Sequence, residues 1–260
     1  MGDRERLYRT EGIVLKRSDW GEADRILVLF TPGHGKLRLV AKGVRKVPSR
    51  KAGHVEPLMR STFLVARGRS LDIITQAEAI DTHPGLRGDL VRTTYGCYLA
   101  ELVDAFSEEG EENEALYQLL ARSLSCLSEG DGPTLLARFF ELRLLTYVGF
   151  RPELQRCVSC GERHAPEAVF WSLAEGGARC RRCGEAIPGV QELSLGAFKV
   201  LRYLQDQEYG AAARLVLRPE TEREVELALR RYLTFVLERN LKSAAFLELV
   251  RGMGCPQEGG

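Results

Sequence analysis

The sequence has no apolar run long enough to cross a membrane. A membrane-spanning helix needs about 20 consecutive apolar residues, and no uninterrupted run in the 260 residues approaches that length. The opening stretch, MGDRERLYRT, is charged and lacks the apolar segment of a secretory signal. We therefore expect a cytoplasmic protein with no membrane partner. In that compartment, thiols stay reduced and bind metals more often than they form disulfides.

Recognisable catalytic motifs are also missing. The segment GHGKLR lacks the glycine spacing and the Ser or Thr of a P-loop, and no dinucleotide-binding, nucleophile-elbow or metalloprotease motif occurs. Only four histidines are present, and they form no acid–base pattern. The pairs Glu108–Glu109 and Glu111–Glu112 lie in a Gly-containing loop and are interpreted as solvated surface. The sequence thus predicts that the protein is not an enzyme.

Cysteine is the residue type that carries the clearest signal. Four of the seven cysteines form two C-x-x-C-G motifs, with nineteen residues (161–179) between the pairs Cys157/Cys160 and Cys180/Cys183. This spacing is typical of zinc knuckles, in which four thiolates hold Zn²⁺ at about 2.3 Å. An iron–sulfur cluster and an empty site are the alternatives. Four thiolates leave no position open for water or substrate, so the zinc is expected to be structural.

The surroundings of these cysteines allow two interpretations. The glycine after each pair, Gly161 or Gly184, is expected to adopt a positive φ. Five arginines flank the knuckles and either contact nucleic-acid phosphates or face solvent beside the negative metal–thiolate centre: Arg156, Arg163, Arg179, Arg181 and Arg182. Outside the motifs, Cys97 and Cys126 fall in helix-like apolar patterns and are predicted to be small core residues.

The first 80 residues predict a small β-barrel. Five short apolar or alternating runs are separated by turn signals, at residues 12–17, 25–31, 36–43, 61–68 and 71–80. Five strands without a long helix favour an OB-fold over residues 1–81, with an SH3-like barrel as the alternative.

From Pro84 the apolar spacing becomes helical. The sequence predicts an α-helical domain over 82–253, interrupted by the zinc-knuckle segment at about 153–188, and a disordered tail at 254–260. Pro219 suits the first turn of a late helix. The predicted fold class is therefore α+β and multi-domain.

Basic charge is concentrated in the barrel. Residues 1–80 contain 16 Lys+Arg and 9 Asp+Glu, whereas the remainder has 21 basic and 27 acidic residues. Residues 25–55 contain no acid at all. Alternation along the strand places Lys36, Arg38 and Lys42 opposite the core-facing Leu37 and Leu39. The predicted DNA-binding residues are this basic set together with Trp20, placed in the first strand-to-strand loop to stack on a base: Arg25, Lys36, Arg38, Lys42, Arg45, Lys46, Arg50 and Lys51.

The barrel, the basic third strand and the interrupting knuckles together resemble the bacterial RecO family of recombination mediators. The matching stretches are EGIVLKRSDWGEADRILVLFTPGHGKLRLVAKGVRK, LLTYVGFRPELQRCVSCG and CRRCG. The resemblance implies a nucleoid-associated DNA-repair protein of the RecF pathway. Such a protein binds single- and double-stranded DNA, anneals complementary strands and, with RecR, helps RecA load on DNA coated by the single-stranded-DNA-binding protein.

The resemblance also implies that the C-terminal tail of the single-stranded-DNA-binding protein docks on the helical domain. Arg138, Arg143 and Arg202 are candidates to border that groove. Two alternatives remain open. One is a zinc-ribbon transcription or translation factor that contacts nucleic acid through the knuckles. The other is a scaffold whose basic face meets an acidic protein; a metal-dependent hydrolase is disfavoured by the closed ligand set.

Overall fold

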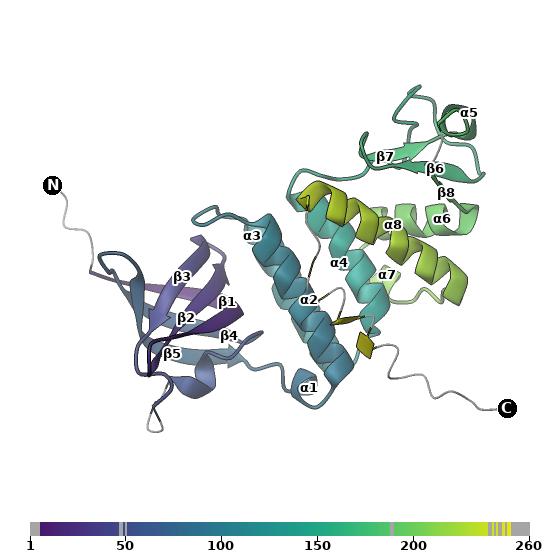
Figure 1. The fold of residues 1–260 in the computed structure, drawn as a ribbon. Helices are drawn as coiled ribbons and strands as arrows, with labels where there is room; N and C mark the ends of the chain where they lie inside the picture. The colour runs from purple at the N-terminus through teal and green to yellow at the C-terminus, as the bar shows by residue number, and fades with distance from the viewer. Residues whose placement is uncertain are drawn as a thin grey trace. The chain divides into compact units, whose positions relative to one another are not determined.

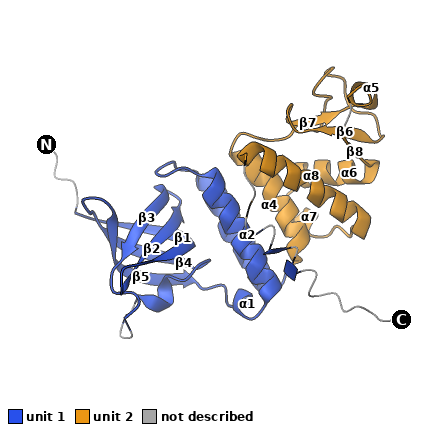
Figure 2. Cartoon of the chain, in the orientation of Figure 1, with its two compact units in different colours: residues 1–130, 242–260 blue, residues 131–241 orange. Residues whose placement is uncertain are grey.

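The computed structural model describes residues 6–46, 49, 51–187, 190–238, 241, 243, 246–247 and 249–250. The chain forms two compact units, residues 1–130 with 242–260 and residues 131–241 (Figure 2). Arg50 and the predicted tail 254–260 lie outside the described residues. Within the described part, no helix has the length and apolar character needed to cross a bilayer.

The first unit begins with a closed barrel of five strands in the order β1-β2-β3-β5-β4 (Figure 1). Its elements are β1 (Leu7–Trp20), β2 (Asp24–Thr31), β3 (Gly35–Ala41), the 3₁₀ turn η1 (Ala52–His54), β4 (Arg60–Ala66) and β5 (Asp72–Asp81). Antiparallel pairing joins β1 to β2 and β4, β2 to β3, and β4 to β5. Closure comes from a short parallel pairing of β3 with β5. The five-stranded OB-like barrel is thus confirmed.

Strand β1 is longer than its apolar run indicates. It pairs with β4 through Leu7 to Ile13 and with β2 from Ile13 to Trp20, with a register shift between Val14 and Lys16. A bulge bends a strand, which lets one strand serve two neighbours at a barrel corner. Trp20 is consequently the last residue of β1 and not a loop residue as predicted.

Alternating apolar side chains fill the barrel. The buried cluster includes Val14, Leu27, Leu39, Phe63 and Ile74. Leu39 is buried and Leu37 packs against the cluster, as the predicted alternation along β3 requires. Val40, on the other face, is also buried at 8% exposure. The outer face of β3 is therefore covered at this position, and the predicted basic stripe is interrupted.

Three helices complete the described core of this unit: α1 (Pro84–Arg87), α2 (Leu90–Phe106) and α3 (Glu114–Glu129). Asp89 and Asn113 cap α2 and α3 by accepting backbone N–H bonds. Cys126 is half-buried and Cys97 exposed. The prediction that Cys97 is a core residue was therefore wrong. The apolar residues around it form the buried face of α2, and Cys97 lies on a different face of the same helix.

The second unit combines helices with a small sheet. Its elements are α4 (Pro133–Tyr147), β6 (Val169–Ser172), β7 (Gly177–Arg179), α5 (Arg181–Gly184), β8 (Gln191–Leu193), α6 (Leu195–Asp206), α7 (Tyr209–Ala212) and α8 (Pro219–Leu237). The strands form an antiparallel sheet in the order β7-β6-β8 (Figure 1). Trp171 of β6 is 2% exposed and meets Tyr232 of α8 edge-on at 5.6 Å between ring centroids. Pro219 lies in the first turn of α8 as predicted. Helical packing thus continues on both sides of the cysteine segment.

Candidate metal centre and nucleic-acid interface

The four knuckle cysteines converge on one point. Their Sγ atoms all lie within 4.8 Å of one another, and the Sγ atoms of Cys160 and Cys180 are 3.9 Å apart. A tetrahedral zinc with Zn–S bonds of about 2.3 Å requires S–S separations of about 3.8 Å. Cys157 is buried, whereas Cys160 is exposed. The cluster therefore has the donor set and compactness of a closed four-thiolate metal site.

Each cysteine pair is held by its own backbone turn, but the two glycines act differently. Gly161 has a φ of +75°, and its N–H donates to the Cys157 carbonyl at 2.9 Å. This is the predicted positive-φ turn. Gly184 instead belongs to α5, and a Cβ there would lie 2.2 Å from the Phe170 ring. The expectation of a positive φ at Gly184 was wrong, since this glycine is needed for close packing against β6.

The pKa values of two knuckle thiols are shifted in opposite directions. Burial raises the pKa of Cys157, but hydrogen bonds from the backbone N–H groups of Cys160, Cys180 and Ser159 outweigh it and lower that pKa to about 6. Burial and neighbouring thiols raise the pKa of Cys180 to about 12. Several thiolates this close repel one another unless a metal ion compensates their charge. The residues present thus fit a bound metal.

Most knuckle arginines already have partners within the knuckles. Arg156 donates to the Gly161 carbonyl at 3.1 Å, and Arg179 to the Cys183 carbonyl at 3.3 Å. Arg181 lies 3.7 Å from Glu185, and Arg182 lies 3.3 Å from Glu162. These contacts give four of the five arginines a role within the metal segment, which neither of the two predicted interpretations included. Among the five, Arg163 is exposed and has no side-chain partner in the described chain.

His164 is close in sequence to the cysteines but is not one of the clustered ligands. Its ring meets Phe198 edge-on at 5.1 Å between centroids. Burial lowers the pKa of His164 and so favours the neutral ring. His164 therefore contributes to packing against α6 through this ring contact.

The predicted DNA-binding residues on the barrel fall into two groups. Lys42, Arg45 and Lys46 are exposed beyond the end of β3. Trp20 is 54% exposed at the end of β1. Arg45 lies 3.4 Å from Asp19, whereas Lys42 and Lys46 have no carboxylate within ion-pair distance in the described chain. A flat aromatic ring and accessible cations are the elements of single-strand binding surfaces.

The other cations are already engaged. Arg25 is close to both Asp19 and Glu56, at 3.2 and 3.3 Å. Lys51 donates to the Ile74 carbonyl at 3.0 Å, and burial lowers its pKa. Lys36 and Arg38 lie beside the carboxylates of Asp104 and Glu109. The predicted stripe is therefore not one continuous open surface.

The structure also reveals a cationic group that the sequence interpretation missed. Arg9 on β1 and Arg67 and Arg69 after β4 are exposed, and none of the three has a carboxylate partner in the described residues. The Arg67 guanidinium lies 5.0 Å from the centroid of the Tyr8 ring. The sequence contained a signal for Arg67 and Arg69, because they lie in the turn RGR between two apolar runs, where charged side chains are expected to be exposed.

Comparison with known proteins supplies the family. The model described as "Recombination protein O N terminal" matches residues 5–83, and that described as "Recombination protein O C terminal" matches residues 87–245. The chain belongs to the RecO family. Curated relatives of the chain, including the two described next, carry the name "DNA repair protein RecO". That of Roseiflexus sp. (strain RS-1) is 42% identical over 96% of this chain and 88% of its own length. That of Pelotomaculum thermopropionicum is 41% identical over 94% of each chain.

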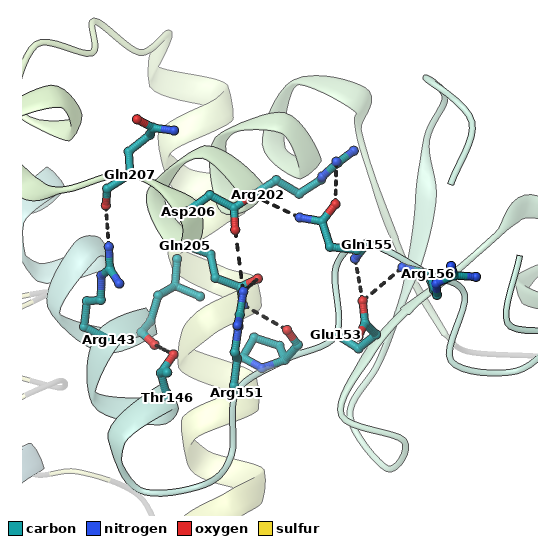
Figure 3. A network of polar contacts seen from close by, with 12 residues as sticks. Arg143, Thr146, Arg151, Glu153, Gln155, Arg156, Arg202, Gln205, Asp206 and Gln207 are labelled. Carbon is teal, nitrogen blue, oxygen red and sulfur yellow. Dashed lines mark hydrogen bonds and ion pairs between the residues drawn. The ribbon is translucent and has the colours of Figure 1, made fainter. Parts of the chain in front are cut away.

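In this RecO protein, a polar network supports the segment that leads into the first knuckle (Figure 3). Arg202 on α6 donates to the Gln155 side chain at 2.6 Å, and Gln155 in turn donates to Asp206 at 3.0 Å. The Glu153 carboxylate accepts the backbone N–H groups of Gln155 and Arg156 at 2.6 and 3.0 Å. The last turn of α6 therefore holds residues 153–156 in place.

The three arginines considered for a partner groove on this RecO chain all have contacts within the protein, and one of them is buried. Arg138 is 2% exposed and lies 2.7 Å from Glu141 and 3.8 Å from Glu226. Its candidacy was wrong, because no surface partner reaches a guanidinium enclosed by this ion pair. Arg143 donates to the Gln207 carbonyl at 2.5 Å (Figure 3). Its guanidinium also lies over the Phe139 ring.

Proposed function

We propose that this RecO protein is a non-enzymatic recombination mediator in DNA repair. It binds single- and double-stranded DNA, anneals complementary strands and, with RecR, helps RecA load on DNA coated by the single-stranded-DNA-binding protein. Family membership supports the repair role. The observation that carries the DNA-binding part is the group of exposed cations Lys42, Arg45 and Lys46 on a closed barrel, near an exposed Trp20.

Charge explains how such a surface promotes annealing. Cations that contact phosphates release condensed counterions, and this binding is largely independent of sequence. A strand held on the barrel has part of its charge neutralised, so a complementary strand approaches with less repulsion. Duplex formation then proceeds downhill without nucleotide hydrolysis. Arg9, Arg67 and Arg69 extend the accessible charge beyond the predicted residues.

The metal in this proposal is a structural Zn²⁺ bound by the four knuckle cysteines. When bound, it crosslinks the two C-x-x-C turns and takes no part in DNA chemistry. The same residues support the prediction of a knuckle segment at about 153–188. We retain the helical domain at 82–253 as part of the proposal. The zinc-ribbon alternative places DNA on the knuckle arginines, and it is weaker because four of the five already bond to neighbouring groups.

The remaining partners follow from the family resemblance. We place RecR, the tail of the single-stranded-DNA-binding protein and, indirectly, RecA among them. Of the arginines considered for the tail, Arg202 and Arg143 remain candidates. Because the proposed activity takes place on chromosomal DNA, we expect the protein to associate with the nucleoid.

A salt series of DNA binding tests the proposal. Fluorescence anisotropy with a labelled single-stranded oligonucleotide compares the wild type with Lys42→Ala/Arg45→Ala/Lys46→Ala. Each lost phosphate contact reduces the slope of log K against log salt by about 0.7, so three contacts reduce it by about 2.1. The matched control Lys199→Ala/Arg214→Ala/Arg223→Ala removes three exposed charges from the second unit. Equal slopes for the wild type and an equally folded barrel variant would contradict the proposed surface.

A further inference from the structure

A basic cleft of about 300 Å³ lies within the first unit, between the barrel and the segment that joins α2 to α3. We define the basic cleft by its four cationic lining residues, Lys16, Arg17, Lys36 and Arg38. Asp104 and Glu109 are the two acidic residues in its lining. Arg17 is also paired with Glu56, which lies outside the lining. The other three cations face two carboxylates, so the lining keeps an excess of one positive charge.

The two carboxylates are placed on the cations. Lys16 Nζ lies 2.5 Å from Asp104 Oδ2. Lys36 Nζ donates to the Asp104 carbonyl at 2.7 Å and lies 3.5 Å from its Oδ1. Arg38 Nε lies 3.7 Å from Glu109 Oε1. The side chain of Lys36 is only 14% exposed as a result, which makes it poorly accessible to an external anion.

Backbone contacts hold the acidic residues in this position. We call residues 104–112 the acidic segment. The N–H of Gly110 donates to the Lys36 carbonyl at 3.1 Å, and Glu109 pairs with Lys36 as an isolated parallel bridge. Gly35 has a φ of +60°, and a Cβ there would lie 2.1 Å from the Glu111 carbonyl oxygen. The side chains of these glutamates are exposed, as predicted, while the backbone that carries them is docked on β3.

We propose that the basic cleft is a second phosphate-binding site for nucleic acid, which Asp104 and Glu109 occupy in the DNA-free protein. This inference rests on the proposed DNA-binding function of the barrel and names a site beyond Lys42, Arg45 and Lys46. The carboxylates stand in for phosphate oxygens on Lys16, Lys36 and Arg38. A bound strand displaces them, and the acidic segment thereby weakens DNA binding to the barrel.

The energies of these ion pairs are compatible with displacement. Both partners of the Arg38–Glu109 pair are about half exposed, at 49% and 60%, and exposed pairs of this kind are weak because water and salt screen them. A phosphate oxygen is an equivalent acceptor that also releases counterions when it binds. Replacement of Glu109 by a phosphate on Arg38 therefore costs little free energy. Most of the free-energy cost of opening the cleft comes from breaking the contacts of Asp104.

The test compares DNA affinity in Asp104→Asn/Glu109→Gln with that of the wild type over a salt series. Two additional phosphate contacts make the slope of log K against log salt steeper by about 1.4. If the plots for the variant and the wild type meet at 1 M salt, this slope corresponds to about 25-fold tighter binding of the variant at 0.1 M salt. The control Glu78→Gln/Glu129→Gln makes the same change in net charge at exposed acids elsewhere in the unit. Glu109→Gln alone, at an exposed position, provides a variant that keeps Asp104 and is expected to steepen the slope by about 0.7.

The outcomes separate this inference from the proposed function. A gain that exceeds the control and disappears when Lys16→Ala/Lys36→Ala is added supports the cleft. If the acid variants bind no better than the control while the Lys42/Arg45/Lys46 variant still loses affinity, the cleft proposal is overturned and the barrel site stands. If that barrel variant also binds like the wild type, the proposed DNA surface itself fails.

Discussion

The Tyr117 hydroxyl offers a quantitative test of how the barrel is joined to the helices of its unit. Tyr117 on α3 is fully buried, and its hydroxyl donates to Glu11 Oε1 on β1 at 2.5 Å. Arg60 Nε on β4 donates to the same oxygen at 2.7 Å. Burial raises the pKa of Glu11, but the hydrogen bonds from Arg60 and Tyr117 outweigh it and place that pKa below its ordinary value of 4.5. The ionised carboxylate is thus the stabilised form.

Tyr117→Phe removes one charge-assisted hydrogen bond and leaves the ring. Such bonds contribute about 1.5–3 kcal/mol. The Glu11 side chain is 31% exposed, so screening places the expected loss near the lower end, about 1.5 kcal/mol. For a unit of this size, about 4 °C per kcal/mol gives a decrease in Tm of about 6 °C.

The stability that Tyr117 gains from Glu11 depends on pH, because it requires the ionised carboxylate. Because the folded-state pKa of Glu11 is lowered, its stabilisation is complete above about pH 4.5 and is lost as the pH falls through the folded value. Thermal melting of both proteins over a series from pH 7 downward should therefore show a large difference at pH 7, which shrinks only as the pH falls below 4.5 and through the folded-state pKa of Glu11. Tyr232→Phe is the matched control, since its buried hydroxyl donates to the neutral Phe150 carbonyl at 3.2 Å. A loss for Tyr117→Phe that stays constant throughout the acid series until the protein unfolds would refute the role assigned to the Glu11 charge.

Two further predictions concern the second unit. Cys160→Ser should reduce bound zinc, measured by metal release, and shift the fluorescence of the buried Trp171 to the red in a Trp20→Phe background. DNA affinity measured with Trp20 intact should not change, and a parallel loss of DNA binding would favour the zinc-ribbon alternative. Glu141→Gln should destabilise the protein by about 3–5 kcal/mol in denaturant unfolding, because it leaves the charge of buried Arg138 poorly compensated. Arg138→Met/Glu141→Met should recover most of that loss, and an additive loss would contradict this explanation.

Local patterns in the sequence were sufficient for the barrel and the metal cluster. Period-two alternation along residues 25–41 specifies which side chains enter the barrel, and the two C-x-x-C turns are set by adjacent backbone bonds. The knuckle sheet escaped prediction because β7 and β8 contain only three residues each. Strands that short carry no detectable period.

The missed features of the candidate site depend on contacts distant in sequence. Lys36 meets Asp104 across 68 residues, so a count of charges along the chain could not show that this lysine is covered. Gly184 is similar, because its partner ring, Phe170, belongs to another element. The prediction of the basic surface relied on the acid-free range of residues 25–55. Arg67 and Arg69 lie outside this range and were therefore not predicted.

The parallel pairing that closes the barrel is its shortest. Strands β3 and β5 are in register only at Leu39–Asp72 and Val40–Ile73, whereas β2 and β3 pair continuously from Arg25–Ala41 to Thr31–Gly35. Local opening is easiest where the fewest backbone hydrogen bonds must break together. The amide protons of this seam should therefore exchange with solvent before those of the β2–β3 ladder. The barrel can loosen on one side of β3 while the other side of the same strand stays paired.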